Sequence, residues 1–533
     1  MSASFLSFAQ VADAVGATPK RLEKARLVGA WLSGLDDDDL RRAVVWLSGR
    51  VFPQCDQRTV QVGGRSLFRV LEERAGTDLR QQMVGLGDLG DLARAVLPEQ
   101  PARETLESVE RHFAELSGLS GSLERYAALR SWLADQAPLE ARYVVKLLSG
   151  DLRIGLQEGA VEDALARLCG VPVGQVQWAN MLLGDVGDTA VLARHGRLHE
   201  ARMRLFHPLK FMLATPAATL DDVARQMPPE FVVEDKYDGI RGQVHVGPDE
   251  SAAHGRVLNG MRVAIFSRTL DDITESFPEI VETCSRLSDA VILDGEILPV
   301  DGERIRPFAD LQKRLGRKVL TPAMLAAVPV SYVAYDVLYA QGAVRLDEPF
   351  SARRARLEAL DVRRAPSKRF VGSGDLDAEF SAARARGNEG LLVKDPGSTY
   401  KPGRRGREWL KIKRAMATLD VVVTAVEVGH GKRAHMLSDY TFAVRASETD
   451  GTLLNVGKAY SGLTDREILD LGQWFEAHTV EAFGHGRYRI VEPHVVLEVT
   501  FDAVQPSQRH KSGFALRFPR IVRRREDKPA SDV

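Results

Sequence analysis

The spacing of apolar residues changes once along this chain of 533 residues, and that change limits the possible folds more than any other feature. Up to about residue 200, apolar side chains recur every three or four positions, as in RLEKARLVGAWLSGL and SLERYAALRSWLADQ, which is the period of amphipathic helices. From about Phe231 they form short alternating runs such as FVVED and GQVHV, which is the period of strands. Because the length allows about three domains, we expect a multidomain protein.

Two boundaries divide the chain into three predicted domains. Residues 1–205 are expected to form an all-α domain. Residues 206–416 mix strands such as AVILDGEILPV and SYVAYDVLY with helical segments such as SARRARLEAL, which predicts an α+β domain. Residues 417–533 carry the short strands LDVVVTAVEV, TFAVRAS and HVVLEVTF, at spacings that indicate a small β-barrel.

Charge is divided unevenly along the chain although its sum is close to zero. The chain has 72 basic and 73 acidic side chains and a net charge of −1. Residues 401–533 hold 22 basic and 17 acidic residues, so the last quarter is positive by 5 and the first 400 residues are negative by 6. Bulk charge therefore does not support nucleic-acid binding, and only a local positive patch would.

Cysteine usage and hydropathy exclude two further classes of protein. Cys55, Cys169 and Cys284 lie more than a hundred residues apart, which predicts reduced thiols and neither a disulfide framework nor a thiolate zinc site. No apolar run reaches the roughly 18 residues of a membrane helix, and the opening MSASFLSFAQ lacks a basic segment followed by an apolar one. We expect a soluble protein of the cytoplasm that does not bind membranes.

The segment EDKYDGIR carries the first candidate for chemistry. Its pattern predicts a strand that ends near Lys236, a turn at Asp238–Gly239 and a returning strand. Glu234 and Lys236 are two apart and so share one face. An accessible lysine at a strand end suits a nucleophilic amine if its pKa is lowered, and Arg241 is one cation that could lower it. Taken alone, however, this string is more typical of an ordinary hairpin.

Further carboxylates and lysines follow on later strands. Asp294 and Glu296 share one face of an apolar strand, where two carboxylates need a counter-charge such as Mg²⁺. Tyr335 lies in a strand, where its ring suits either stacking on a base or an ordinary core position. Glu389 and Lys394 are five apart and would face opposite ways in a regular strand. If both serve one site, Glu389 must lie before the strand or at a bulge.

Lys411 and Lys413 form the last pair in this series. They share one face of the segment WLKIKR, while Leu410 and Ile412 share the other. Two ammonium groups on one face suit a phosphate whose negative charge grows during a reaction. A solvated strand face would show the same alternation, so this segment by itself does not decide between the two interpretations.

Taken in order, these segments resemble the nucleotidyltransferase motifs of ATP-dependent DNA ligases. The first 200 residues also resemble the helical DNA-binding domain of archaeal and eukaryotic replicative ligases, best at LSGDLRIG. The last domain would then be the oligonucleotide/oligosaccharide-binding (OB) fold of that family. The segments that carry the resemblance are KYDGIR (236–241), SRT (267–269), DGE (294–296), VAYD (333–336), EGLLVK (389–394), WLKIK (409–413), RFPR (517–520) and REDK (525–528).

The resemblance implies a reaction in three steps. The Nζ atom of Lys236 would attack the α-phosphorus of ATP, releasing pyrophosphate and leaving a lysyl-AMP. AMP would then pass to the 5′-phosphate of a nick in double-stranded DNA, and the 3′-hydroxyl would seal the strand and release AMP. ATP is the implied cosubstrate and Mg²⁺ the implied metal, with Mn²⁺ as a substitute. Such transfers depend mainly on positioning and charge neutralisation.

The same resemblance assigns roles to individual residues. The metal would be held by Glu296 and Glu389. Phosphates would be held by cationic residues on several strands, namely Arg241, Arg268, Lys394, Lys411 and Lys413. Tyr335 would stack on adenine, Glu234 would accept from its amino group, and Asp294 would hold the ribose or support the site. The covering domain would orient the pyrophosphate with Arg520, Arg525 and Lys528, while Arg153, Lys432 and Arg433 would contact DNA.

Three alternatives remain open at this stage. RNA ligases and mRNA-capping guanylyltransferases share the Lys-x-Asp-Gly string, but the helical front and the R-x-D-K ending favour a DNA ligase. An NAD-dependent ligase is disfavoured because the chain has no four-cysteine zinc site. A catalytically inactive nick-binding protein would keep the fold without the reaction. We expect a monomer, and no sliding-clamp peptide is evident in the sequence.

Overall fold

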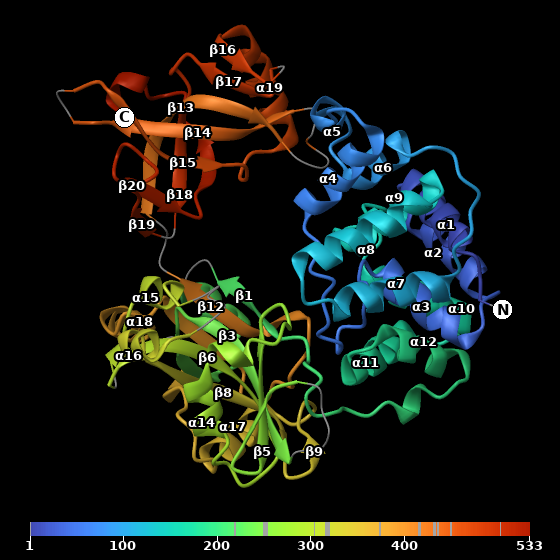
Figure 1. Ribbon diagram of the computed structural model, residues 1–533. Coiled ribbons are helices and arrows are strands. Elements are labelled where there is room, and N and C mark those ends of the chain that lie inside the picture. The colour runs from blue at the N-terminus through green and yellow to red at the C-terminus, as the bar shows by residue number, and fades with distance from the viewer. Residues whose placement is uncertain are drawn as a thin grey trace. The chain divides into compact units, whose positions relative to one another are not determined.

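The computed structural model contains two compact units, Met1–Ile412 and Lys413–Val533 (Figure 1). Residues 2–533 are described, except for eleven short gaps. These gaps are 218–219, 249–253, 303, 315–319, 373–374, 414–416, 430–432, 434–435, 448–449, 485 and 502, together with the side chains of 220, 413, 417 and 503. Among the described residues, no helix is both long and apolar enough to cross a membrane. All three cysteines are free, as predicted.

The predicted helical front is confirmed, and α1 to α12 gather into one helical assembly (Figure 1). Helix α7 shows why these segments are helical. Thr105 and Ser108 form a capping box at its start, and Leu106, Val109 and Phe113 fall on its buried face. The helices are α1 (Phe5–Ala17), α2 (Arg21–Leu32), α3 (Asp37–Leu47), α4 (Gly64–Ala75), α5 (Arg80–Leu86), α6 (Leu89–Val96), α7 (Leu106–Gly118), α8 (Ser122–Ala134), α9 (Pro138–Leu148), α10 (Glu158–Cys169), α11 (Val173–Leu183) and α12 (Val186–Arg194), followed by the short η1 (Leu198–Glu200).

The rest of the first unit is built on two sheets, which confirms the predicted mixture of strands and helices. The larger sheet is antiparallel in the order β4-β5-β3-β6-β8-β9, with β7 paired to β6. One face packs against α14 and α17 through a core that includes Leu293 and Ile297. The elements are β3 (Ile240–Pro248), β4 (Arg256–Leu258), β5 (Met261–Ser267), η2 (Thr274–Ser276), α14 (Pro278–Cys284), β6 (Val291–Asp301), β7 (Arg304–Ile305), α15 (Phe308–Gln312), α16 (Pro322–Ala327), β8 (Val330–Ala340), β9 (Ala343–Val344) and α17 (Phe350–Glu358).

The smaller sheet has the order β1-β12-β11-β2-β10. Its outer face is covered by α13 and α18, which pack on Phe231 and Val233. Its other face shares a core with the larger sheet, because Val232, Ile292 and Trp409 belong to one buried cluster. The two sheets therefore pack face to face. The elements are β1 (Leu213–Ala217), α13 (Leu220–Gln226), β2 (Glu230–Lys236), β10 (Ser367–Val371), α18 (Leu376–Ala385), β11 (Gly390–Lys394) and β12 (Arg405–Lys413).

The hairpin predicted around Asp238–Gly239 is wrong, although both of its strands exist. Strand β2 belongs to the smaller sheet and β3 to the larger one, so the chain crosses from one sheet to the other between them. A Cβ atom at Gly239 would lie 2.4 Å from the carbonyl oxygen of Ile297. Glycine is thus required here by the close approach of β6 and not by a two-residue hairpin turn.

The second unit is rich in strands, as predicted. Its main sheet has the order β15-β14-β13-β17-β16, and β18 pairs with both β13 and β21. Among the described residues these pairings trace an open sheet, so closure into a barrel stays a prediction. The domain boundaries also stay predictions. The elements are β13 (Ala417–Val428), β14 (Leu437–Arg445), β15 (Leu453–Ala459), α19 (Asp465–Ala477), β16 (Thr479–Phe483), β17 (Tyr488–Val491), β18 (Val496–Phe501), β19 (Ala503–Pro506), β20 (Phe514–Arg517), β21 (Arg520–Arg524) and η4 (Ala530–Asp532).

Candidate active site

Lys236 lies at the end of β2, on the face that looks toward the larger sheet. Its side chain is 20% exposed, and its Nζ atom lies 2.5 Å from Oε2 of Glu389. Glu389 immediately precedes β11, which is one of the two positions that strand geometry allowed for it. Its backbone N–H donates to the carbonyl oxygen of Lys236 over 2.8 Å. The amine and the carboxylate are therefore brought together by both side-chain and backbone contacts.

Glu296 and Asp294 share one face of β6, as the strand period predicted. Burial is the main reason that the pKa of Glu296 lies at about 8, well above the usual value of a glutamate. The carboxylates of Asp294 and Glu389 act in the same direction, because they disfavour another negative charge. The cations Lys236 and Arg241 oppose this rise. Three carboxylates and two cations thus influence one another across the two sheets.

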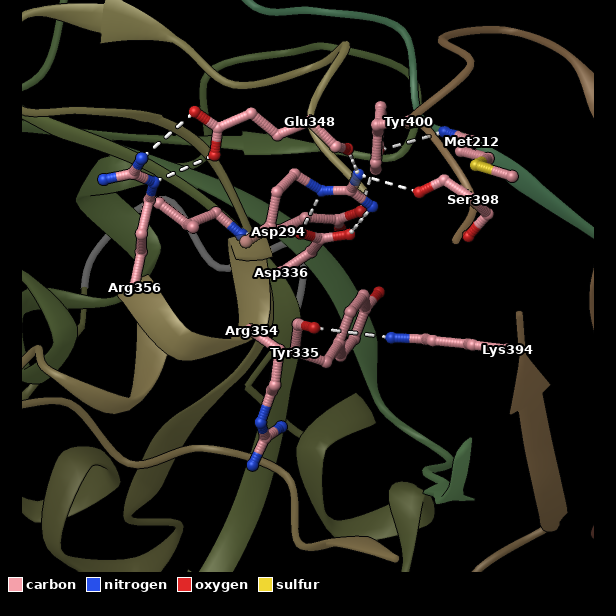
Figure 2. Close-up of polar contacts among 12 residues, drawn as sticks. Met212, Asp294, Tyr335, Asp336, Glu348, Arg354, Arg356, Lys394, Ser398 and Tyr400 are labelled. Carbon is pink, nitrogen blue, oxygen red and sulfur yellow. Dashed lines mark hydrogen bonds and ion pairs between the residues drawn. The ribbon is translucent and has the colours of Figure 1, made fainter. Parts of the chain in front are cut away.

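Asp294 is fully buried and accepts three hydrogen bonds from two residues. Arg241 binds it with two hydrogen bonds, from Nε over 3.0 Å and from Nη2 over 2.7 Å. Tyr400 donates its hydroxyl to Asp294 over 2.7 Å and accepts from the backbone N–H of Met212. Figure 2 shows Asp294, Tyr400 and Met212 in this group. Arg241 also donates to the Met212 carbonyl oxygen, so it links two chain segments. Neither Tyr400 nor Met212 stood out in the sequence.

Glu234 and Lys394 form a second buried group. The Lys394 Nζ lies 2.7 Å from Oε2 of Glu234, and both side chains are almost completely buried. Burial raises the pKa of Glu234, whereas Lys394 lowers it. Arg354 adds a second cation, 3.3 Å from the other oxygen of Glu234. In this structure the Lys394 ammonium is therefore paired with a carboxylate, and its predicted contact with phosphate stays a prediction.

Aromatic rings surround the Lys394 ammonium. Its Nζ lies 4.4 Å from the ring centroid of Trp409, 4.5 Å from that of Phe350 and 5.0 Å from that of Tyr335. Figure 2 shows Lys394 directed toward Tyr335. Tyr335 occupies a bulge, because Asp294 and Gly295 of β6 pair with residues 336 and 334 of β8. Tyr335, which was predicted to lie in a strand, is therefore at a bulge of β8 and contacts the Lys394 ammonium.

A second buried ion pair lies next to Tyr335 in the sequence and was missed by sequence reasoning. Asp336 and Arg353 are both fully buried and are joined by two hydrogen bonds of 2.8 and 2.9 Å. Arg353 also donates to the carbonyl oxygens of Glu348 and Ser398, residues that Figure 2 labels. Arg353 lies in an arginine-rich helix that looks solvated in sequence, so no local signal could have identified it.

The other cations predicted to hold phosphate are Lys411, Lys413 and Arg268. Lys411 is half-buried, and Leu410 and Ile412 are buried on the opposite face of β12 as predicted. The side chain of Lys413 lies outside the described part of the structure. Arg268 is exposed immediately after β5. The structure therefore confirms that Leu410 and Ile412 share the buried face of β12, and the contacts of the three cations with phosphate stay predictions.

The residues predicted to contact DNA lie in two separate units. In the helical part, Arg153 donates to the carbonyl oxygen of Gly87 over 2.8 Å and is half exposed. In the second unit, Arg433 binds Asp465, with a shortest distance of 2.8 Å. Lys432 lies outside the described residues. Each described residue keeps part of its side chain accessible, and their contact with DNA stays a prediction.

Two basic residues near the C-terminus, Arg525 and Lys528, form ion pairs with carboxylates of the second unit. Arg525 contacts Asp420 over 2.9 Å and Asp527 over 2.9 Å, and Lys528 contacts Asp420 over 3.0 Å. Arg520 begins β21, where it is exposed and pairs with residue 500 of β18. Sequence reasoning singled out these cations but not Asp420, which lies about a hundred residues earlier in the chain.

Three family models match successive parts of the chain. The model described as "DNA ligase N terminus" matches residues 4–166. The model "ATP dependent DNA ligase domain" matches 211–413, which contains both sheets of the site. The model "ATP dependent DNA ligase C terminal region" matches 433–528. Together the three matches follow the order of the helical part, the two-sheet part and the strand-rich unit.

Relatives are similar over nearly the whole chain. A protein of Koribacter versatilis named "Probable DNA ligase" is 45% identical over 98% of this chain and 94% of its own length. Proteins named "DNA ligase" from Halorubrum lacusprofundi and Archaeoglobus fulgidus are 35% and 32% identical, each over 99% of this chain and 97% and 96% of their own lengths. A solved structure named "Pmar-Lig_Pre" is 17% identical with a TM-score of 0.62, and the likeness covers 97% of this chain and 99% of the other, which shows a shared fold.

Proposed function

This chain belongs to the family of ATP-dependent DNA ligases, and we propose that it uses the amine of Lys236 to join a 3′-hydroxyl to a 5′-phosphate at a nick in duplex DNA. The observation that carries the proposal is the placement of this amine. Lys236 is partly exposed at a strand end, between two sheets, and touches a carboxylate. A nucleophilic lysine must be accessible and held in one orientation, and this position provides both.

The first step transfers AMP from ATP to Lys236. The Nζ atom forms a bond to the α-phosphorus, the bond to the leaving pyrophosphate breaks, and the amine loses a proton. Lys411 and Lys413 on β12, with Arg241 and Arg268, are proposed to hold the phosphates as negative charge accumulates. The burial of Leu410 and Ile412 on one face of β12 supports this role, because the strand period then assigns the lysines to the other face. AMP then passes to the 5′-phosphate, and the 3′-hydroxyl displaces it.

Glu296 and Glu389 are the proposed ligands of a divalent cation, Mg²⁺ or Mn²⁺. Their oxygen donors suit these hard ions. The raised pKa of Glu296 also fits, because it reflects buried negative charge that a cation would stabilise. When bound, the metal would neutralise charge on the carboxylates and on the triphosphate. Asp294 is a weaker candidate for contact with the nucleotide, because Arg241 and Tyr400 already bind its oxygens.

Recognition of adenine is proposed to depend on Glu234 and Tyr335. A carboxylate can accept a hydrogen bond from the amino group at position 6 of adenine, whereas guanine presents an oxygen there. Glu234 is held in place by Lys394 and Arg354, which supports a fixed acceptor. The proximity of the Tyr335 ring to Lys394 places an aromatic side chain beside this acceptor. The nucleotide choice of the protein therefore tests this part of the proposal.

The second unit is proposed to be an OB-fold lid that acts on the nucleotide and on DNA. Its strand-rich architecture and its match to a ligase C-terminal region support this assignment. Arg520, Arg525 and Lys528 would orient the leaving pyrophosphate, Arg525 and Lys528 once they are freed from Asp420. Arg433 and Lys432, with Arg153 of the helical part, would contact phosphates of DNA, so affinity should fall steeply with salt. The proposed active form is a monomer.

Labelling with nucleotides tests the reaction directly. The purified protein is incubated with α-³²P-labelled ATP or GTP, and the modified residue is identified by mass spectrometry. We expect an AMP adduct on Lys236 with ATP, none in Lys236→Ala, and normal labelling in Lys313→Ala, which removes an exposed lysine that pairs with Asp310. Labelling by GTP would indicate a capping-type transferase. Binding of nicked DNA without any labelling would indicate an inactive scaffold, and sealing of RNA nicks alone would indicate an RNA ligase.

A further inference from the structure

Asp235 lies between Glu234 and Lys236 in β2 but faces the other way. Successive side chains of a strand alternate between its two faces. Asp235 therefore lies on the side of the smaller sheet that carries Phe231 and Val233 and packs under α18. It is 9% exposed. A carboxylate on this otherwise apolar face needs polar partners in order to be tolerated.

These partners come from the segment that leads into β11. Arg386 donates two hydrogen bonds to Asp235, from Nε over 2.8 Å and from Nη2 over 2.6 Å. Asn388 donates its side-chain Nδ2 to the same carboxylate over 2.7 Å, and Asn388 is almost completely buried. Asp235 thus binds both ends of the three-residue stretch that precedes Glu389.

Asn388 and Glu389 are consecutive, and they reach opposite faces of the smaller sheet. Asn388 binds Asp235 on the outer face, while Glu389 contacts the Lys236 amine on the inner face. Two neighbouring residues of β2 are thereby matched to two neighbouring residues before β11. The following Gly390 adds a constraint, because a Cβ atom there would lie 2.1 Å from the carbonyl oxygen of Ile412. Glu389 is therefore held between a close backbone approach and a side-chain anchor.

We propose that Asp235 is a positioning residue for AMP transfer, because its hydrogen bond to Asn388 holds the Glu389 carboxylate at the Lys236 amine. This inference rests on the proposed function, in which Lys236 is the nucleophile. Asp235 touches neither the amine nor the Glu389 carboxylate on the opposite face. Replacing it by an apolar residue would leave the buried Asn388 amide without its acceptor and release the segment that carries Glu389.

The test uses the full-length protein and compares four variants. Asp235→Ala and Asn388→Ala each remove the anchor. Asp235→Asn keeps an oxygen that accepts from Asn388, and Glu379→Ala is the matched control, because Glu379 binds Arg386 over 2.8 Å without touching Asp235. The measured quantities are kcat and KM for ATP in lysyl-AMP formation at saturating Mg²⁺, thermal unfolding, and hydrogen exchange of the peptide that contains the Glu389 amide.

We expect the two alanine variants to lower kcat by about tenfold to a hundredfold, the range given by one lost hydrogen bond to a charged group, with KM for ATP almost unchanged. Hydrogen exchange of the peptide that contains Glu389 should rise, because the hydrogen bond from the Glu389 N–H to the carbonyl oxygen of Lys236 is loosened. Asp235→Asn should restore most of the rate, and Glu379→Ala should behave like the parent. The double variant Asp235→Ala/Asn388→Ala should be no slower than either single variant.

Two results would overturn the inference. One is a folded Asp235→Ala protein with a parental kcat. The other is multiplicative loss in the double variant, which would mean that the two side chains act independently. If Asp235→Ala fails to fold, Asn388→Ala and Asp235→Asn still decide the matter. Failure of the proposed function is recognised separately, because the parent protein itself would then form no adduct on Lys236.

Discussion

The buried pair of Asp336 and Arg353 allows a quantitative prediction about stability. Arg353→Met leaves the Asp336 carboxylate fully buried without its cation and removes donors from two carbonyl oxygens. Breaking a buried pair in this way costs about 3–5 kcal/mol. For a part of the chain of 150–250 residues, each kcal/mol lowers Tm by about 2–4 °C, so we expect a fall of about 6–20 °C.

The assay is differential scanning calorimetry of the full chain, following the transition that shifts when ATP is added. Arg353→Met is compared with the double variant Asp336→Leu/Arg353→Met, which replaces both charges by apolar groups of similar size. The double variant should be more stable than the single one, because no unpaired charge remains buried. Arg26→Ala, which breaks an exposed helical pair with Glu23, should leave Tm unchanged. A fall below 3 °C in Arg353→Met, or a double variant no more stable than Arg353→Met, would refute the reasoning.

Three further predictions concern the separate parts of the chain. Burial, and next to it the charge of Glu104, raises the pKa of Glu140 from the ordinary 4.5 to about 7, so the folded protein loses stability as pH rises through that window. Glu140→Gln should therefore raise the free energy of unfolding at pH 8 by about 3 kcal/mol, seen in calorimetry as a higher Tm, and should hardly change it at pH 4. Truncation before Arg517 should block self-adenylation far more than sealing of pre-adenylated nicks, and equal loss in both gel assays would contradict the lid role. Removal of residues 1–200 should weaken binding of nicked DNA in gel shifts while sparing lysyl-AMP formation, and loss of the adduct would show that the helical part supports the chemistry.

Local patterns in the sequence were sufficient to predict where helices and strands occur and in which order the candidate site residues follow one another. Apolar spacing identified the helical front and the later strands, because the periods of helices and strands are properties of consecutive residues. The same reasoning placed Glu296 beside Asp294 on one face and required Glu389 to lie before its strand or at a bulge. Lys236 was recognised because its neighbours form a string whose types and order match a known family.

Contacts between distant segments could be decided only by the packing of the two sheets. Arg241 and Asp294 are 53 residues apart, Glu234 and Lys394 belong to different strands, and Asp235 meets Asn388 from 153 residues away. Strand alternation says which side chains share a face, but it does not say which sheet the strand joins, as the crossing at Gly239 shows. Because hydrogen bonds and ion pairs act over a few ångströms, the partner of each buried charge is set by tertiary structure, whereas the chemical types available for the site are set by the sequence.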